Sequence, residues 1–174
     1  MTKNPHQRPQ RWQSLVDEFQ HTSNRTVVIL GTTYLKNHLG RLIRCFLVDD
    51  QETITQLLGP EAPIETFGGR IRAAYALGLI SPNEYHDLIQ ILHIRNAFLD
   101  RLDSSKLTDD GIREKCYALR IPREILLPDE TPTPRRLFEF ATALIAGQLM
   151  VRAAQAEIER RTPPENFMLV DVER

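Results

Sequence analysis

The sequence has very little cysteine, since only Cys45 and Cys116 occur among its 174 residues. Two cysteines so far apart are too few for the disulfide framework of a small secreted domain. They also lack the close Cys-x-x-Cys spacing of a zinc site, so we predict no metal centre. We expect both thiols to be small buried side chains in a reducing compartment.

The sequence also lacks the marks of secretion and of membrane insertion. Its first residues, MTKNPHQRPQRWQ, are polar and contain no apolar centre of a signal peptide. Apolar stretches such as VVILGTTYL at residues 27–35 are far shorter than the roughly 20 residues that span a bilayer. We therefore expect a cytoplasmic protein that is not bound to a membrane.

Neither sign of charge dominates, because 22 basic residues are balanced by 23 acidic ones and the net charge is -1. Such a protein has no overall field that would draw it onto nucleic acid. The rest of the composition, 41% hydrophobic and 26% charged, is that of an ordinary globular protein. A chain of this length is sufficient for one domain with a hydrophobic core.

Apolar residues recur at helical spacing through most of the chain, and no segment shows the alternation of a strand. We predict an all-α protein, a single-domain helical bundle of about six to seven helices with a central αα-hairpin. The expected domain covers residues 10–162, between a flexible tail at 1–9 and a C-terminal tail at 163–174. Helices are expected at residues 12–19, 27–48, 50–58, 67–77, 82–102, 109–119 and 135–161. The segment 121–134 contains four prolines and should be an extended connection.

The expected helix at 27–48 is unusual because no acidic residue occurs within it. The cations in this helix and just before it form a candidate basic surface: Arg25, Lys36, Arg41 and Arg44. One interpretation is a core helix whose polar rim meets acidic residues of neighbouring helices. Another is a stripe that faces phosphate or acidic groups in an assembled complex. Direct DNA binding through this helix is a third hypothesis.

Residues 78–84 carry a strong signal for a tight connection between two helices. Gly78 is suited to the left-handed conformation that often ends a helix. Ser81 is a good N-cap, Pro82 suits the first helical position, and Glu84 completes a capping box with Ser81. The sequence therefore predicts an αα-hairpin at this point.

The second helix of the hairpin contains the best candidate for a site. Its predicted apolar face consists of Tyr85, Leu88, Leu92 and Leu99. Arg95 continues this face and Asn96 borders it, and burying either side chain without a partner would be costly. One interpretation is that Arg95 pairs with an acid such as Asp87 or with helix-end carbonyl groups. The other is that Arg95 and Asn96 line a groove that binds an anion or a partner.

The segment GGRIRAAYALGLISPNEYHDLIQILHIRNAF, residues 68–98, resembles the signature of the mannitol operon repressor (MtlR) family. In that signature an arginine-containing helix ends in a Gly-Leu-Ile type of turn. A helix with an Ile-Arg-Asn motif follows, which here is Ile94, Arg95 and Asn96. The later segment LTDDGIR, residues 107–113, also resembles a segment that follows this motif, and the rest of the chain shares only a general helical similarity.

The resemblance implies a helical transcriptional regulator without a DNA-binding motif, which acts through a protein partner such as a DNA-binding regulator. The residues agree, because they show neither a recognition helix nor a catalytic or phosphate-loop motif. We therefore expect no cofactor, no enzyme activity and no direct sequence-specific DNA binding. A homodimer is compatible with the alanine-rich last helix, and the sequence leaves this open. The predicted partner-binding residues are Arg70, Asp87, Arg95, Asn96 and Asp100.

A more distant resemblance relates Arg95 and Asn96 to HEPN ribonucleases, helical domains in which a histidine follows shortly after the arginine. That histidine would transfer protons at a ribose 2′-OH. The corresponding positions here are Asp100, Arg101 and Leu102, so the histidine is absent. An aspartate is ordinarily ionised at neutral pH and is a poor replacement. The alternative hypothesis is a degenerate HEPN-like module that binds RNA or a nucleotidyltransferase partner.

Overall fold

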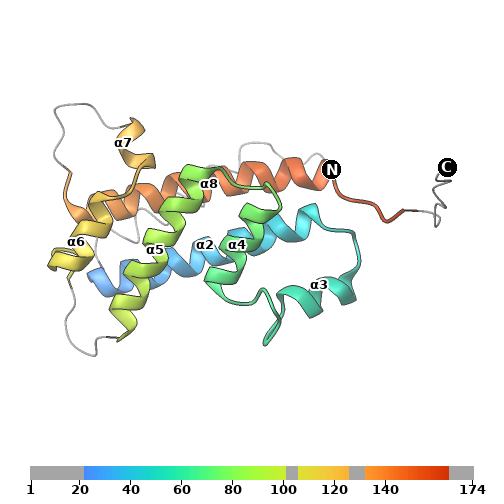
Figure 1. Cartoon of the computed structure of the whole chain (residues 1–174), viewed down its shortest axis with the longest axis horizontal. Helices are drawn as coiled ribbons and strands as arrows, with labels where there is room; N and C mark the ends of the chain where they lie inside the picture. The colour runs from blue at the N-terminus through green and yellow to red at the C-terminus, as the bar shows by residue number, and fades with distance from the viewer. Residues whose placement is uncertain (1–21, 101–105, 126–131, 165–174) are drawn as a thin grey trace, which may run out of the picture.

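The computed structural model describes residues 22–100, 106–125 and 132–164, and every regular element in these ranges is a helix (Figure 1). The described helices are α2 (Asn24–Phe46), α3 (Gln51–Leu58), α4 (Phe67–Ala76), α5 (Pro82–Asp100), α6 (Asp110–Tyr117), α7 (Ile121–Ile125) and α8 (Pro134–Ile158). The predicted all-α bundle is confirmed. The predicted helix at 12–19, the N-terminal tail and most of the C-terminal tail lie outside the described residues.

The helices α2 and α8 form the long axis of the bundle and run side by side in the same direction (Figure 1). Their first turns are joined by Arg135, whose Nη1 donates to the Thr22 carbonyl oxygen at 2.9 Å and to Asn24 Oδ1 at 3.1 Å. Their ends are joined by the backbone, because the Arg161 N–H donates to the Phe46 carbonyl oxygen at 3.1 Å. The two helices are therefore a parallel pair that is fixed at both ends.

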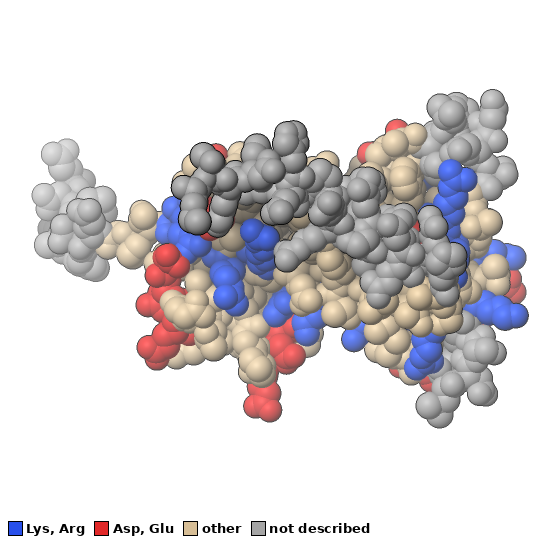
Figure 2. Space-filling model, turned by 180° about the vertical axis from the view of Figure 1, so that it is seen from behind, with Lys and Arg blue, Asp and Glu red and all other residues tan. Residues whose placement is uncertain are grey.

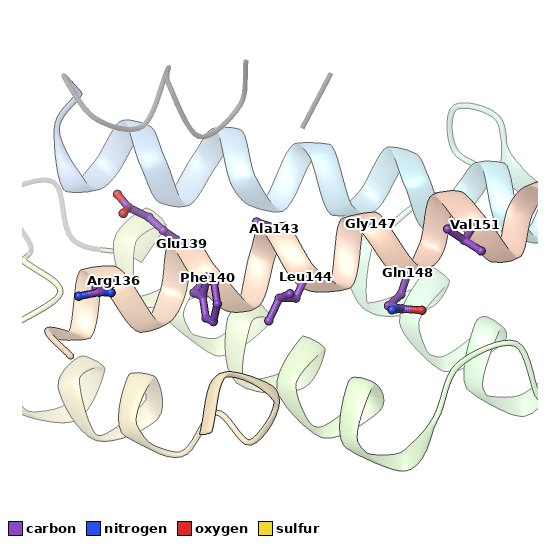
Figure 3. A pocket seen from close by; sticks show the side chains of 8 residues that line it. All are labelled: Arg136, Glu139, Phe140, Ala143, Leu144, Gly147, Gln148 and Val151. Carbon is purple, nitrogen blue, oxygen red and sulfur yellow. The ribbon is translucent and has the colours of Figure 1, made fainter. Parts of the chain in front are cut away.

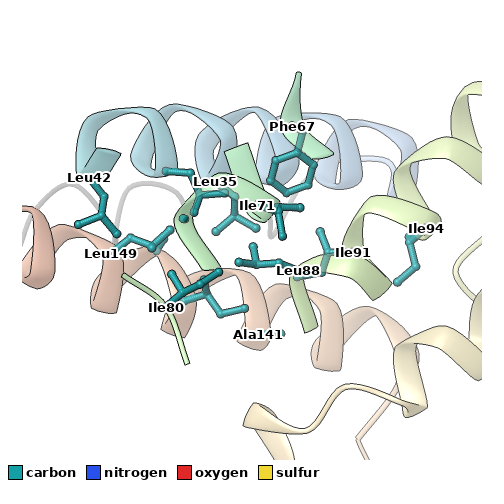
Figure 4. Close-up of a cluster of buried hydrophobic side chains, with 14 of the residues drawn as sticks. Leu35, Leu42, Phe67, Ile71, Ile80, Leu88, Ile91, Ile94, Ala141 and Leu149 are labelled. Carbon is teal, nitrogen blue, oxygen red and sulfur yellow. The ribbon is translucent and has the colours of Figure 1, made fainter. Parts of the chain in front are cut away.

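The hydrophobic core lies between this pair and the hairpin helices α4 and α5 (Figure 4). Ile80 adds to it from the hairpin turn. Truncating one buried leucine or isoleucine to alanine typically costs about 2–5 kcal/mol, so this cluster fixes the relative positions of the four helices. Its labelled helical members are Leu35 and Leu42 from α2, Phe67 and Ile71 from α4, Leu88, Ile91 and Ile94 from α5, and Ala141 and Leu149 from α8.

Side-chain caps explain where four of the helices begin. The caps of α2, α3, α4 and α8 are Ser23, Asp50, Thr66 and Thr133, and each accepts the backbone N–H three residues ahead. The Asp50 carboxylate accepts the Thr53 N–H at 2.7 Å, and this hydrogen bonding lowers the pKa of Asp50. The predicted start of α3, near residue 50, is confirmed, whereas α2 begins at Asn24, three residues before the predicted start at 27, because Ser23 supplies the cap.

By length and composition alone, α8 could span a bilayer, because it has 25 residues and a mean hydropathy of 1.3 over its most apolar window. Core helices of bundles meet the same criteria. The inward side of α8, which includes Phe138, Ile145 and Leu149, has no exposed surface and contributes to the core cluster. We therefore interpret α8 as a core helix.

The predicted extended connection at 121–134 is wrong over its first part, because Ile121–Ile125 form the short helix α7. Pro122 lies in the first turn of α7, where a proline removes no helical hydrogen bond. In addition, the Asp87 carboxylate of α5 accepts the N–H groups of Arg120 and Ile121 at 2.9–3.0 Å. This cap comes from a distant part of the chain, so the local sequence does not reveal it.

Candidate functional site

The turn between α4 and α5 ends the first helix in the way that the sequence predicts. Gly78 has a φ of 70°, in the left-handed region. Its N–H donates to the Tyr75 carbonyl oxygen at 3.0 Å, and the Leu79 N–H donates to the Ala74 carbonyl oxygen at 2.9 Å. This pair of bonds is the Schellman motif. The rings of Tyr75 and Tyr85 stack across the hairpin with centroids 4.4 Å apart, which adds an aromatic contact between the two helices.

The predicted capping box begins α5. Glu84 Oε2 accepts the Ser81 N–H at 2.7 Å, and Ser81 Oγ accepts the Glu84 N–H at 3.3 Å. The same carboxylate is paired with Arg152 of α8, which also donates to the Leu79 carbonyl oxygen. The capping glutamate therefore connects the hairpin to α8. The ion pair was missed from the sequence, although an arginine among the small apolar residues of α8 was a signal for it.

Asp87, which was predicted to contact a partner, is fully buried at 0% exposure. Its carboxylate accepts the backbone N–H groups of Arg120 and Ile121 and lies 3.0 Å from His86 Nδ1. An ionised group in the protein interior requires such donors, because its desolvation is otherwise very costly. Asp87 therefore lies inside the bundle, where its hydrogen bonds connect α5 to the start of α7. In the described structure no bond joins Asp87 to Arg95.

The buried face of α5 differs from the predicted one. It keeps the predicted Leu88 but contains Ile91, Ile94 and Phe98 in place of Leu92 and Leu99, and Leu99 is 42% exposed. The reason is that α5 packs against α4, α6 and α2 together, so its neighbours on several sides decide which residues are buried.

Arg95, Asn96 and Asp100 consequently lie outside the core, near the end of α5. Arg95 is half-buried, whereas Asn96 and Asp100 are exposed. The described ranges of the chain hold no hydrogen-bond or ion-pair partner for these three side chains. We call this group the outer end of α5. It lies apart from Asp87, so the structure does not bring all the predicted partner-binding residues together.

Arg70 of α4 joins three segments of the chain. Its guanidinium donates to the carbonyl oxygens of Lys36 in α2 at 3.0 Å, Leu58 in α3 at 2.9 Å and Ile64 at 3.1 Å. It lies directly against Gly40, where a Cβ atom would come within 2.6 Å of Arg70 Nη1. A side chain at position 40 would therefore displace Arg70. Gly40 was missed from the sequence because its role depends on a contact with a distant helix.

Two of the predicted basic residues, Arg41 and Arg44, lie with Arg70 around a hollow of about 410 Å³. We call it the arginine depression, lined by Asn37, Gly40, Arg41, Arg44, Leu58 and Arg70. Arg41 and Arg44 are exposed, and neither has a hydrogen-bond or ion-pair partner in the part of the chain that the structure describes. The fold thus joins one predicted partner-binding residue with part of the predicted basic surface.

The other two basic residues are placed differently. Lys36 Nζ lies 3.6 Å from Glu65 Oε1 and is therefore partly neutralised. Arg25 is in the first turn of α2, at the opposite end of that helix from Arg44. Figure 2 shows that basic side chains on one face of the molecule form separate groups rather than one continuous patch. The predicted basic surface is therefore divided.

A second hollow, of about 560 Å³, follows the exposed side of α8 (Figure 3). We call it the α8 groove, lined by Arg136, Glu139, Phe140, Ala143, Leu144, Gly147, Gln148 and Val151. Its charged members are at one end, and most of the others are apolar. Phe140 is 36% exposed and Val151 is 66% exposed. The small residues of this helix are evident in the sequence, but the groove is not.

Both cysteines are buried and free, as the sequence predicts. Burial raises the pKa of the Cys116 thiol to about 12, so this thiol is unreactive in the folded protein. Among the described residues, no group of three or more His, Cys, Asp or Glu side chains is arranged to hold a metal ion.

The fold is an all-α bundle built on a parallel helix pair and a hairpin, and it has a similar counterpart among solved structures. A chain of the X-ray structure of the MtlR-HPr complex from Escherichia coli matches with a TM-score of 0.65 and 15% sequence identity. The match covers 79% of this chain and 97% of that chain. At this identity the likeness concerns the fold, and it gives no support to the more distant HEPN resemblance. No protein-family model and no curated protein match the sequence.

Proposed function

We propose that this protein is a cytoplasmic, MtlR-like transcriptional regulator that acts through contact with a protein partner and does not catalyse a reaction. The observation that carries the proposal is the similarity in fold to a chain of the MtlR-HPr complex. The family resemblance of residues 68–98 supports it independently, because that resemblance rests on sequence alone. The exposed Asp100 at the position of the HEPN histidine supports the absence of ribonuclease chemistry.

HPr is the first partner to test, because it is the partner in the similar structure. Two exposed features of this chain are suited to a protein contact: the α8 groove and the outer end of α5. Apolar groups at the centre of an interface usually contribute most of the binding free energy, whereas charged groups mainly set the association rate and specificity. We expect the α8 groove to contribute most to affinity.

The test is a calorimetric titration of the purified chain with purified HPr from the same organism. Val151→Glu changes the α8 groove, and Ile125→Glu is its control, because Ile125 is an equally apolar side chain, 56% exposed on α7. We expect Val151→Glu to weaken binding at least about tenfold and Ile125→Glu to leave it unchanged. If HPr shows no binding, the proposed partner is wrong.

The regulator hypothesis also makes an expectation about nucleic acids. In a gel-shift assay with operator DNA, the purified protein alone should give little specific binding. The protein should also catalyse no reaction when the partner is added. Tight binding that resists salt would contradict the partner-dependent mechanism. Cleavage of RNA that disappears in Arg95→Ala would favour the HEPN-like alternative instead.

A further inference from the structure

The arginine depression carries positive charge that the fold neutralises only in part. Arg41, Arg44 and Arg70 line it, and no Asp or Glu is among its described lining residues. Burial lowers the pKa of Arg70; Glu65 partly offsets this effect and Arg44 adds to it. Three cations are thus held near one another, and a bound anion would relieve their mutual repulsion.

The three guanidinium groups differ in how firmly they are held. Arg70 is fixed, because Nε, Nη1 and Nη2 each donate to a backbone carbonyl oxygen and Gly40 lies directly against it. A guanidinium has five N–H donors, so these three bonds leave two of its N–H groups unused. Arg41 and Arg44 are exposed and unpaired within the described ranges, and they lie one helical turn apart on α2. The depression therefore combines one guanidinium group that is fixed by hydrogen bonds, that of Arg70, with two that are exposed.

We propose that the arginine depression binds the phosphate group of a small organic phosphate ester. Guanidinium groups bind phosphate through paired N–H···O bonds, and a phosphate has more oxygens and more charge than a carboxylate to satisfy three of them. The volume of about 410 Å³ lies within the range of small-molecule sites, about 300–1,000 Å³, and leaves room for an organic part. A concave site suits such a ligand better than duplex DNA, whose grooves are read by protruding elements.

This site does not depend on the proposed protein partner, so the two hypotheses are tested with different probes. The probes are inorganic phosphate and glycerol phosphate, with glycerol, sodium chloride and sodium acetate at equal ionic strength as controls. Binding is measured by calorimetry and by the rise in the melting temperature, which grows with ligand concentration when only the folded state binds. We expect saturable binding of glycerol phosphate and inorganic phosphate but not of the controls.

The decisive variant is the double substitution Arg41→Gln/Arg44→Gln, which removes exposed side chains and should leave the fold intact. Its matched control, Arg113→Gln/Arg123→Gln, removes the same charge from α6 and α7. We expect the first variant to weaken phosphate binding at least about tenfold and the second to change it less than about twofold.

Four results would overturn the assignment. The first is the absence of saturable phosphate binding by the full chain, and the second is an equal loss in both double variants, which would indicate nonspecific screening. The third is binding of inorganic phosphate with exclusion of glycerol phosphate, which would rule out an ester ligand. Binding of a single-stranded oligonucleotide that phosphate does not displace would also assign this surface to nucleic acid instead.

Discussion

At the start of α5, Glu84 and Asp87 are 4% and 0% exposed, whereas at its end Asn96 and Asp100 are exposed to solvent. The first two residues bind backbone N–H groups and Arg152, and they connect α5 to α7 and α8. The residues at the outer end have no such partners in the described structure. One helix therefore contains polar residues with opposite roles, since some hold the fold together and others are available to a partner.

The comparison shows that polar residues within one sequence signature need not form one site. A buried carboxylate serves the folding of the protein. Its removal would leave buried N–H donors without acceptors. An exposed asparagine or aspartate contributes little to stability, so its presence requires no structural explanation and suits a binding surface. Substitutions at the two ends of α5 should separate these roles.

The largest effect is expected for Asp87→Ala. The N–H groups of Arg120 and Ile121 would lose their acceptor, and hydrogen bonds to charged groups are worth about 1.5–3 kcal/mol each, so the loss should be roughly 3 kcal/mol or more. Denaturant unfolding measures this change. Alkylation of Cys116 at pH 8 gives a second readout, because the buried thiol should react faster once the segment after α6 is released. Asp100→Asn is the control, and an unchanged unfolding midpoint for Asp87→Ala would contradict the assigned role.

A smaller effect is expected for Arg152→Met, which leaves Glu84 buried without its cation. The Arg152 side chain is 34% exposed, so we discount the usual value for a buried pair to about 1–2 kcal/mol. The double variant Glu84→Gln/Arg152→Met should recover part of this loss, and a double-mutant cycle measures the coupling. Strict additivity of the two single changes would show that the pair does not contribute.

Ser81→Ala should cost on the order of 1 kcal/mol, because the first turn of α5 loses its side-chain cap. Gly78→Val should cost more, since valine strongly disfavours the left-handed backbone that Gly78 adopts. Thermal unfolding of both variants checks this order. An unchanged melting temperature in Ser81→Ala would mean that the capping box makes no net contribution.

The smallest change in stability is expected at the outer end of α5. Asn96→Ala and Asp100→Asn should alter the free energy of unfolding by less than about 0.5 kcal/mol, as is usual for substitutions of exposed residues. Circular dichroism melts test this expectation, and partner titrations with the same variants show whether these residues contribute to binding. A destabilisation as large as that of Asp87→Ala would remove the distinction between the two ends of the helix.

Local signals predicted the parts of the fold that depend on neighbouring residues. The helical class, the hairpin with Gly78, Ser81 and Glu84, and the start of α3 all follow from periodicity, caps and turn chemistry. Contacts between distant segments were not predictable in this way. The Asp87 cap of α7, the Arg152 pair and the dependence of Arg70 on Gly40 each join residues that are far apart in the sequence.

The candidate site was predicted less well than the fold. Arg70, Arg41 and Arg44 were identified as polar residues of interest, but only the packing of α4 on α2 places them around one depression. Asp87 was wrongly expected to be accessible, because sequence alone does not show whether a carboxylate on an amphipathic helix points inward or outward. The α8 groove lies on the exposed side of a helix whose opposite side is in the core. Both sides are apolar, so the hydrophobicity of the residues does not show which side is exposed.

The parallel pairing of α2 and α8 also has a consequence for the order in which the molecule is made. The bonds between their first turns join residues 111 to 113 positions apart, and α8 supplies much of the surface that covers α2. A ribosome adds about 5–20 residues per second, so α2 waits on the order of ten seconds for its partner. Contacts of such long range also slow folding. During this interval α4 and α5 can already pack on α2, but the part of its apolar side that α8 covers in the native fold stays exposed until α8 emerges.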